Sequence, residues 1–159
     1  MEEEDKFYLT KKGLERIKRE YEDLRKLREI KSKGESPEVL HSEDINLEYL
    51  IYQEDLNFLE SRINELENIL KNTVIIKPPK KEKRNVVDLG ALVTLEEPDG
   101  SINEFTIVGT LEANPSEGKI SADSPIGKAL LGKKIGEEVL ITSPIKVPYR
   151  IKKIRYHNM

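Results

Sequence analysis

The sequence predicts an α+β protein, in which an N-terminal antiparallel two-helix coiled coil precedes a small antiparallel sheet domain with one short helix. Apolar residues recur at helical spacing through the first half of the chain, Pro78 and Pro79 interrupt that pattern, and short strand-like segments follow. Hydrophobic residues make up only 36% of the 159 residues. This low share suits two helices that each bury a single narrow stripe.

The first helix is expected over residues 11–33, between the N-cap Thr10 and the natural stop Gly34. Its apolar residues recur in steps of three and four: Leu14, Ile17, Tyr21, Leu24 and then Leu27 or Ile30. The second helix, expected over 45–70, carries a strict heptad seam: Ile45, Tyr49, Tyr52, Leu56, Leu59, Ile63, Leu66 and Leu70. The short connection at 34–44 makes the helices antiparallel neighbours and forms the tip of the coiled coil.

The charges of the two helices are opposite in sign, which favours their pairing. Residues 11–33 contain 10 basic and 5 acidic side chains, whereas residues 34–74 contain 2 basic and 10 acidic ones. The formal net charge of −3 argues against a general DNA binder. The absence of cysteine excludes disulfides and thiolate chemistry. The acidic N-terminus and the lack of long apolar runs predict a cytoplasmic protein that does not contact a membrane.

The second half of the chain is expected to form a separate domain. We place the helical domain at 1–76, a basic linker at 77–85 and the sheet domain at 86–159. The linker's basic run could contact nucleic acid or polymerase, but a solvated linker is the better interpretation. The expected strands and helix are 91–96, 104–108, 119–121, a helix at 125–131 capped by Ser124, 138–142 and 149–154. A turn at 98–100 joins the first two strands.

The tip contains the residues most suggestive of chemistry. Within fourteen residues that contain no Lys or Arg, the chain has five acids: Glu35, Glu38, Glu43, Asp44 and Glu48. Such carboxylates can hold a hard cation such as Mg²⁺ together with oxygen ligands from a partner. Alternatively, they stabilise the positive end of the second helix dipole. The chain has no recognisable nucleotide-binding or nucleophile motif, and we interpret His41 as an ordinary loop residue.

Several segments resemble the bacterial Gre transcript cleavage factors. The most specific is Ile120-Ser-Ala-Asp-Ser-Pro-Ile-Gly-Lys-Ala-Leu-Leu-Gly-Lys133. Tyr8-Leu-Thr-Lys-Lys-Gly-Leu-Glu-Arg-Ile, Phe58-Leu-Glu-Ser-Arg-Ile-Asn-Glu-Leu-Glu67 and Gly90-Ala-Leu-Val-Thr-Leu are similar to the family too. The resemblance covers residues 8–156 and also includes the order of the two domains.

This resemblance implies an FKBP-like C-terminal domain that docks on RNA polymerase at the rim of its secondary channel. Asp123, Ser124 and Pro125 are the docking residues that it implies. The coiled coil would enter the channel, where tip acids help hold a catalytic Mg²⁺ of the polymerase while the 3′ end of backtracked RNA is cleaved. The protein would therefore be a monomeric factor with no cofactor of its own, and not itself an enzyme.

The tip departs from the family pattern, which reads approximately Gly-Asp-Leu-x-Glu-Asn-Ala-Glu-Tyr. Alignment on Asn46-Leu-Glu-Tyr49 puts Ser42 at the Asp position and Ile45 at the Glu position. Glu43 and Asp44 lie between those positions and are the candidate catalytic and metal-binding acids. Gln53-Glu-Asp55 also stands where the family often carries basic residues.

Three functional hypotheses follow. The protein could be a working cleavage factor that uses Glu43 and Asp44, or a Gre-fold regulator that occupies the channel and inhibits the polymerase. A chaperone-like interaction module is a third possibility, which the heptad seam and the acidic tip disfavour. Prolyl isomerase activity is not expected, because Phe105, Tyr149 and Tyr156 are the only aromatic residues of the second half.

Overall fold

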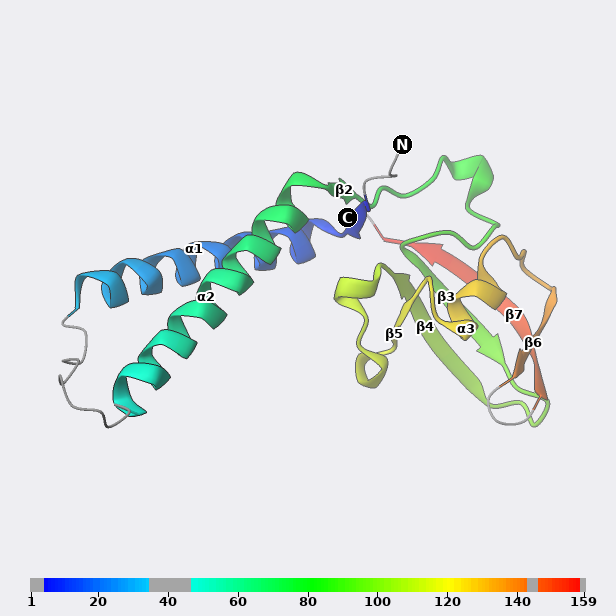
Figure 1. Ribbon diagram of the computed structural model, residues 1–159. Coiled ribbons are helices and arrows are strands. Elements are labelled where there is room, and N and C mark those ends of the chain that lie inside the picture. The colour runs from blue at the N-terminus through cyan, green and yellow to red at the C-terminus, as the bar shows by residue number, and fades with distance from the viewer. Residues whose placement is uncertain (1–4, 35–46, 143–145, 158–159) are drawn as a thin grey trace. The chain divides into compact units, whose positions relative to one another are not determined.

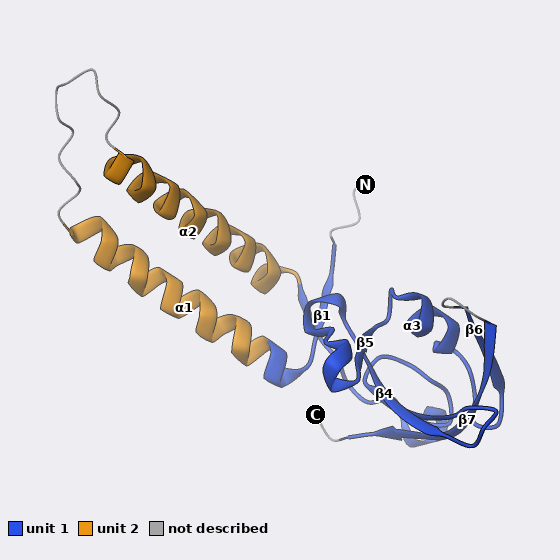
Figure 2. Cartoon of the chain, turned by 90° about the horizontal axis from the view of Figure 1, so that it is seen from below, with its two compact units in different colours: residues 1–13, 73–159 blue, residues 14–72 orange. Residues whose placement is uncertain are grey.

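The computed structural model of the chain describes residues 5–34, 47–142 and 146–157 (Figure 1). The chain forms two compact units (Figure 2). One contains residues 14–72, and the other contains residues 1–13 together with 73–159. The expected domain boundaries lay instead at 76 and 86. The units divide the chain differently because the short strands on either side of the two long helices pair with each other and belong to the unit that contains the C-terminal sheet.

The first unit is a helical hairpin. Helix α1 spans Lys11–Lys33, with its first turn in the other unit, and helix α2 spans Leu47–Lys71. The range of α1 agrees with the predicted 11–33. The second predicted helix is confirmed from Leu47 onward, while Ile45 and Asn46 lie outside the described residues. The helices are antiparallel, since contacts join residue 20 to 62 and residue 31 to 55.

The apolar seam of the hairpin is shallow. Among its described residues, the buried apolar side chains all come from α2: Leu59, Ile63, Leu66 and Ile69. Helix α1 contributes the half-buried Leu14, Ile17, Tyr21 and Leu24. Leu70 is half-buried, like the seam residues of α1, and Ile69 adds a buried residue three positions after Leu66 that the predicted seam did not include. Leu27 and Ile30 are exposed, at 41% and 69%, so the apolar seam of α1 ends before them.

A two-stranded parallel sheet joins the chain before α1 to the chain after α2. Strand β1 is Phe7–Leu9 and strand β2 is Thr73–Ile75, with Tyr8 opposite Val74. The amide of Ile76 donates a hydrogen bond of 2.8 Å to the carbonyl of Leu9. Leu9 and Ile76 are both buried. The sequence did not predict these strands, because three-residue strands carry too little periodicity to recognise.

The expected linker at 77–85 contains a single short 3₁₀ turn, η1 (Lys81–Lys83). The amide of Lys83 donates a hydrogen bond of 2.8 Å to the carbonyl of Lys80 and closes this turn, and the guanidinium of Arg84 donates one of 3.0 Å to the carbonyl of Pro79. Val86 then forms an isolated antiparallel bridge with Lys134. The lysines of the run at 80–83 have mostly exposed side chains, in keeping with a solvated segment.

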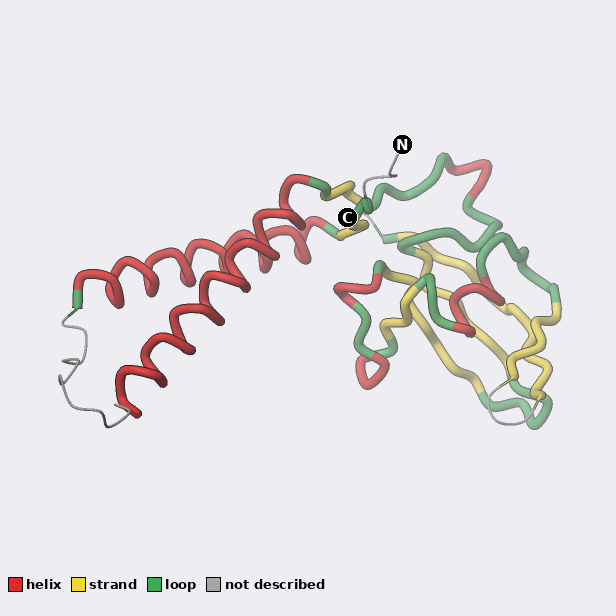
Figure 3. Tube along the Cα trace, in the orientation of Figure 1, coloured by secondary structure: helices red, strands yellow, loops and turns green. Residues whose placement is uncertain are grey.

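The main sheet of the second unit has five strands in the order β5-β4-β3-β7-β6, which are labelled in Figure 1. Strands are yellow in Figure 3. Their bounds are Ala91–Glu96 (β3), Ile102–Val108 (β4), Lys119–Ser121 (β5), Glu138–Thr142 (β6) and Lys146–Tyr156 (β7). The sheet is mixed, because β5 runs parallel to β4, and this corrects the expected antiparallel sheet. The connection that brings the chain from the end of β4 back to the start of the parallel strand β5 contains two one-turn 3₁₀ helices, η2 (Thr110–Glu112) and η3 (Pro115–Glu117).

The core of this unit lies between the sheet and the short helix α3 (Pro125–Leu130). Strand β3 alternates buried and half-buried residues, so that Ala91, Val93 and Leu95 all point into the core. Leu130 of α3 is fully buried in the same cluster. The expected β3–β4 turn is present, and Gly100 has a φ of +87°, a value that glycine adopts without strain.

Candidate functional site

The acids predicted at the tip, including Glu43 and Asp44, fall within residues 35–46 and so lie outside the described part of the chain. No group of three or more His, Asp or Glu side chains capable of holding a metal ion occurs among the described residues. The start of α2 is described from Leu47. There, Gln53 donates a hydrogen bond of 2.9 Å to the hydroxyl of Tyr49, and Asp55 lies 3.7 Å from the ammonium of Lys31.

The expected docking residues surround the N-terminus of α3. The hydroxyl of Ser124 accepts a hydrogen bond of 3.1 Å from the amide of Gly127 and donates one of 2.6 Å to the carbonyl of Ser121. Ser124 is thus an N-cap that also closes the turn before the helix. Pro125 occupies the first helical turn, where its missing N–H costs nothing. The predicted cap and helix start are confirmed.

A close approach of two backbone segments explains the glycine in this helix. A Cβ at Gly127 would collide with the carbonyl oxygen of Ser121. The absence of a side chain therefore lets α3 lie directly on the end of β5. This contact fixes the direction in which the segment 123–125 leaves the sheet.

The carboxylate of Asp123 is exposed and held in one orientation. Its backbone amide donates to the hydroxyl of Ser121 at 3.1 Å, and the hydroxyl of Thr110 donates to its Oδ2 at 3.1 Å. Asp123 and Pro125 are exposed, whereas Ser124 is half-buried and committed to the cap. The side chains of Asp123 and Pro125 are therefore accessible to solvent, while that of Ser124 holds the start of the helix.

A groove of about 440 Å³ lies beside Asp123 and is wholly within the second compact unit. Its lining comes from four stretches of chain that are remote in sequence: Lys6, Phe7 and Tyr8; Asp88 and Leu89; Gly109, Thr110 and Leu111; and Ala122, Asp123 and Leu131. Sequence reasoning found Asp123 but missed Phe7 and Tyr8. Their only signal was an aromatic pair ahead of the first helix, and nothing in the sequence relates this pair to residue 123.

The N-terminal strand is seated closely on η2. A Cβ at Gly109 would collide with the carbonyl oxygen of Tyr8, so only glycine allows this approach. The carboxylate of Glu112 accepts hydrogen bonds from the amide of Thr10 at 2.8 Å and from its hydroxyl at 2.5 Å. The amide of Gly13 in turn donates to the hydroxyl of Thr10 at 3.1 Å, which confirms Thr10 as the N-cap of α1.

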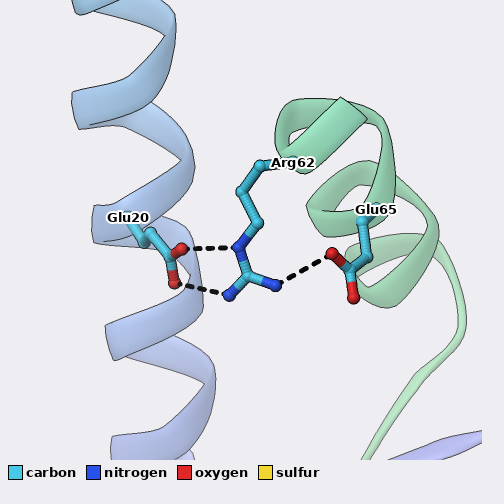
Figure 4. Close-up of polar contacts among 3 residues, drawn as sticks. All are labelled: Glu20, Arg62 and Glu65. Carbon is cyan, nitrogen blue, oxygen red and sulfur yellow. Dashed lines mark hydrogen bonds and ion pairs between the residues drawn. The ribbon is translucent and has the colours of Figure 1, made fainter. Parts of the chain in front are cut away.

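Polar contacts tie the two helices of the hairpin together (Figure 4). The guanidinium of Arg62 on α2 makes two hydrogen bonds with the Glu20 carboxylate on α1, at 2.7 and 3.1 Å, and a third of 3.0 Å to Glu65. The hydrogen bond with Glu20 is the largest cause of a raised pKa of Arg62. A bidentate pair fixes the relative position of two helices better than a single contact does.

A second hydrogen bond between the two helices also helps to hold them in position relative to each other. The hydroxyl of Tyr21 donates a hydrogen bond of 2.8 Å to the carboxylate of Glu67, and this bond raises the pKa of Tyr21. Nearer the start of α2, the hydroxyl of Tyr52 donates a hydrogen bond of 2.8 Å to the carbonyl of Lys31. Tyr52 was expected in the apolar seam, and its half-buried ring combines that position with a polar contact.

None of the helices among the described residues is long and apolar enough to cross a lipid bilayer. A helical hairpin followed by a mixed five-stranded sheet with one short α-helix defines a class of two-part α+β proteins. Two family profiles match this arrangement along the chain. "Transcription elongation factor, N-terminal" matches residues 7–75, and "Transcription elongation factor, GreA/GreB, C-term" matches residues 81–156. The chain belongs to the GreA/GreB family of transcription elongation factors.

Curated relatives agree over most of the chain. Transcription elongation factor GreA of Geobacillus kaustophilus is 42% identical over 147 residues, which cover 91% of this chain and 92% of that protein. GreA of Thermomicrobium roseum is 43% identical over 138 residues, covering 86% and 88% respectively. Among solved structures, the GreA factor homolog Gfh1 of Thermus thermophilus is 31% identical, with a TM-score of 0.43 and coverage of 95% and 99%.

Proposed function

We propose that this protein binds RNA polymerase through the region around Asp123 and Pro125, inserts its hairpin into the secondary channel and stimulates cleavage of backtracked RNA. The observation that carries the proposal is the match of both Gre profiles to consecutive parts of the chain. The relatives named GreA support it, since they share this two-part organisation over about nine-tenths of their length.

The geometry around α3 supports the docking part of the proposal. Asp123 and Pro125 are exposed, and the hydrogen bonds of Ser124 and Thr110 hold them in a defined arrangement. A partner therefore meets a surface that needs little ordering on binding, which favours affinity. Ser124 would contribute by holding the helix start rather than by contacting the polymerase.

The chemical part of the proposal assigns Glu43 and Asp44 to a Mg²⁺ of the polymerase active site. Carboxylate oxygens suit Mg²⁺, which is commonly held by one or two carboxylates together with water and substrate oxygens. A metal placed in this way polarises the scissile phosphate and stabilises developing charge. The factor itself would supply ligands and positioning, while the polymerase carries out the hydrolysis. We expect it to act as a monomer on the 3′ end of the backtracked RNA.

The tip sequence favours a second candidate function. Ser42 and Ile45 stand where the family pattern has its two acting acids, and neither can coordinate a metal as a carboxylate. A factor of this kind would occupy the channel without supporting cleavage and would slow elongation.

A docking experiment tests the part that the two candidates share. Asp123→Ala and Pro125→Ala are each expected to weaken co-purification with the cognate RNA polymerase several-fold, because each removes an exposed group from the proposed contact. Leu140→Ala, which alters an exposed residue of β6, is the control. If Asp123→Ala and Pro125→Ala both kept full binding, the docking assignment would be contradicted.

A cleavage assay on a stalled, backtracked elongation complex separates the candidates. Cleavage stimulated by the wild-type protein and abolished in Glu43→Ala/Asp44→Ala supports the first. The double variant Glu35→Ala/Glu38→Ala is a matched control, since it removes the same charge from other acids of the segment. Polymerase binding with slowed elongation and no cleavage supports the inhibitory candidate.

A further inference from the structure

We propose that the groove beside Asp123 is a composite docking site, in which the N-terminal strand provides one wall through Phe7 and Tyr8. Its occupant would be a segment of RNA polymerase that presents an apolar side chain next to a basic one. This inference rests on the proposed function and extends it, because it brings residues from ahead of the helical hairpin into the polymerase contact.

The first support is the apolar character of the concave surface. Tyr8 and Leu111 are both large and are 42% and 43% exposed, and they line the groove together with the half-buried Phe7 and Leu89. Binding sites typically combine such an apolar lining with a few fixed polar groups. An apolar side chain of a partner that entered this groove would remove these surfaces from water.

The second support is the charge at the groove. The carboxylates of Asp88 and Asp123 both line it, and neither takes part in an ion pair within the described residues. Lys6 is the one cationic side chain among the lining residues of the groove. An excess of oriented carboxylate favours a basic group of the partner beside the apolar one.

Both carboxylates are held by hydrogen bonds, and Oδ1 of Asp88 accepts one of 2.7 Å from the amide of Leu89. The hydroxyl of Thr110 fixes Asp123, as described above. The amide of Asp88 donates a hydrogen bond of 2.9 Å to the hydroxyl of Tyr156, which itself donates to the carbonyl of Val86 at 2.5 Å. The last strand of the sheet thereby positions Asp88.

The third support is that the aromatic wall is preformed. The contact between Gly109 and the backbone of Tyr8 places β1 directly against η2. The hydrogen bonds of Thr10 to Glu112 hold the next residues of the chain on the same element. Because Tyr8 does not have to be ordered on binding, its contacts can contribute fully to affinity.

The test measures the affinity of the full-length protein for purified cognate core RNA polymerase by biolayer interferometry. Tyr8→Ala is expected to weaken binding about tenfold, as for an aromatic group at the centre of an interface. Tyr8→Phe keeps the apolar ring and should bind within twofold of wild type. Leu140→Ala removes a comparably exposed apolar group outside the groove and should have no effect.

Charge is tested separately. Asp88→Asn is expected to weaken binding severalfold at low salt and to reduce the dependence of affinity on salt, because it removes one charge from the contact. Asp99→Asn, in the β3–β4 turn, is the matched control, since Asn can still accept the bond that Ser101 donates. Thermal unfolding followed by circular dichroism checks that every variant is folded.

The outcomes distinguish this inference from the proposed function. If Asp123→Ala loses binding while Tyr8→Ala and Asp88→Asn bind like wild type, docking stands and the composite groove is wrong. If the wild-type protein does not bind polymerase, the proposed function itself fails. If wild type forms a dimer in sedimentation experiments that Tyr8→Ala abolishes, with polymerase affinity unchanged, the groove is an interface between copies and the inference is overturned.

Discussion

The helical hairpin and the sheet unit are stabilised in different ways. The sheet unit has a contiguous cluster of buried apolar residues drawn from strands, loops and α3. The described part of the hairpin has four buried apolar residues, all on α2, and is tied across its helices by Arg62, Tyr21 and Tyr52. A narrow seam buries little area, so its register depends more heavily on polar contacts.

The largest expected effect concerns the core of the sheet unit. Leu130→Ala should lower the free energy of unfolding by about 3 kcal/mol, because it leaves a cavity at a fully buried site. Leu56→Ala, at a half-buried position of α2, should cost about 1 kcal/mol. Urea unfolding followed by circular dichroism measures both. Equal costs would mean that the two regions are packed alike and would remove the contrast.

A smaller effect comes from Tyr156, whose phenol is held inside the sheet unit. Burial raises the pKa of Tyr156 above its usual value. A raised pKa means that the neutral phenol is favoured in the folded state, so its contribution is complete below the usual tyrosine pKa and is lost as the pH rises through the raised one. Tyr156→Phe should cost about 1 kcal/mol near neutral pH, since it removes the hydrogen bond to Val86.

The measurement for Tyr156 is the free energy of unfolding of wild type and Tyr156→Phe as a function of pH. The difference between them should shrink above about pH 10, where the wild-type phenol ionises. Subtraction of the two curves cancels the other tyrosines with raised pKa values, Tyr21 and Tyr149. A difference that stays constant to high pH would show that folding does not raise the pKa of Tyr156, and no difference near neutral pH would show that its hydrogen bonds contribute nothing.

The smallest expected effect is electrostatic and belongs to the hairpin. A double-mutant cycle of Arg62→Met and Glu20→Gln should give a coupling energy of about 0.5 kcal/mol, because both side chains remain about one-third exposed. The coupling should decrease with added salt. Hydrogen exchange of the α2 amides is the readout specific to this unit. The same cycle on the ion pair of Lys152 and Glu96 in the sheet unit, whose side chains are 47% and 31% exposed, provides the control.

The elements with strong local signals were predicted well. Helix α1 and strands β3, β5 and β6 have the predicted bounds, because Thr10, Gly34 and regular alternation mark them in the sequence. Strand β7 spans Lys146–Tyr156 and is longer at both ends than the predicted 149–154. Pro148 is accommodated within the β6–β7 pair, where it lies opposite Leu140. Nothing in the sequence indicated that β4 and β5 pair in parallel, because the direction of β5 depends on the path that the chain takes between the two strands.

The candidate site was only partly predictable for the same reason. Ser124 and Pro125 form a local cap signature, and Asp123 adjoins it. Tyr8 and Asp88 reach the same groove only because the chain folds back through η2 and β7. Sequence spacing carries no information about such contacts between remote segments. The acids at 43 and 44 remain a prediction, as they lie outside the described residues.

The sequence by itself determined the two long helices, most strands of the sheet and membership of the Gre family, because caps, periodicity and a specific motif are local properties. Tertiary structure alone decided the mixed sheet, the pairing of β1 with β2 and the seating of Tyr8 against Gly109. These features depend on which distant backbones can approach closely and satisfy their hydrogen bonds together. The wall of the groove is therefore a consequence of folding that no single segment of the chain encodes.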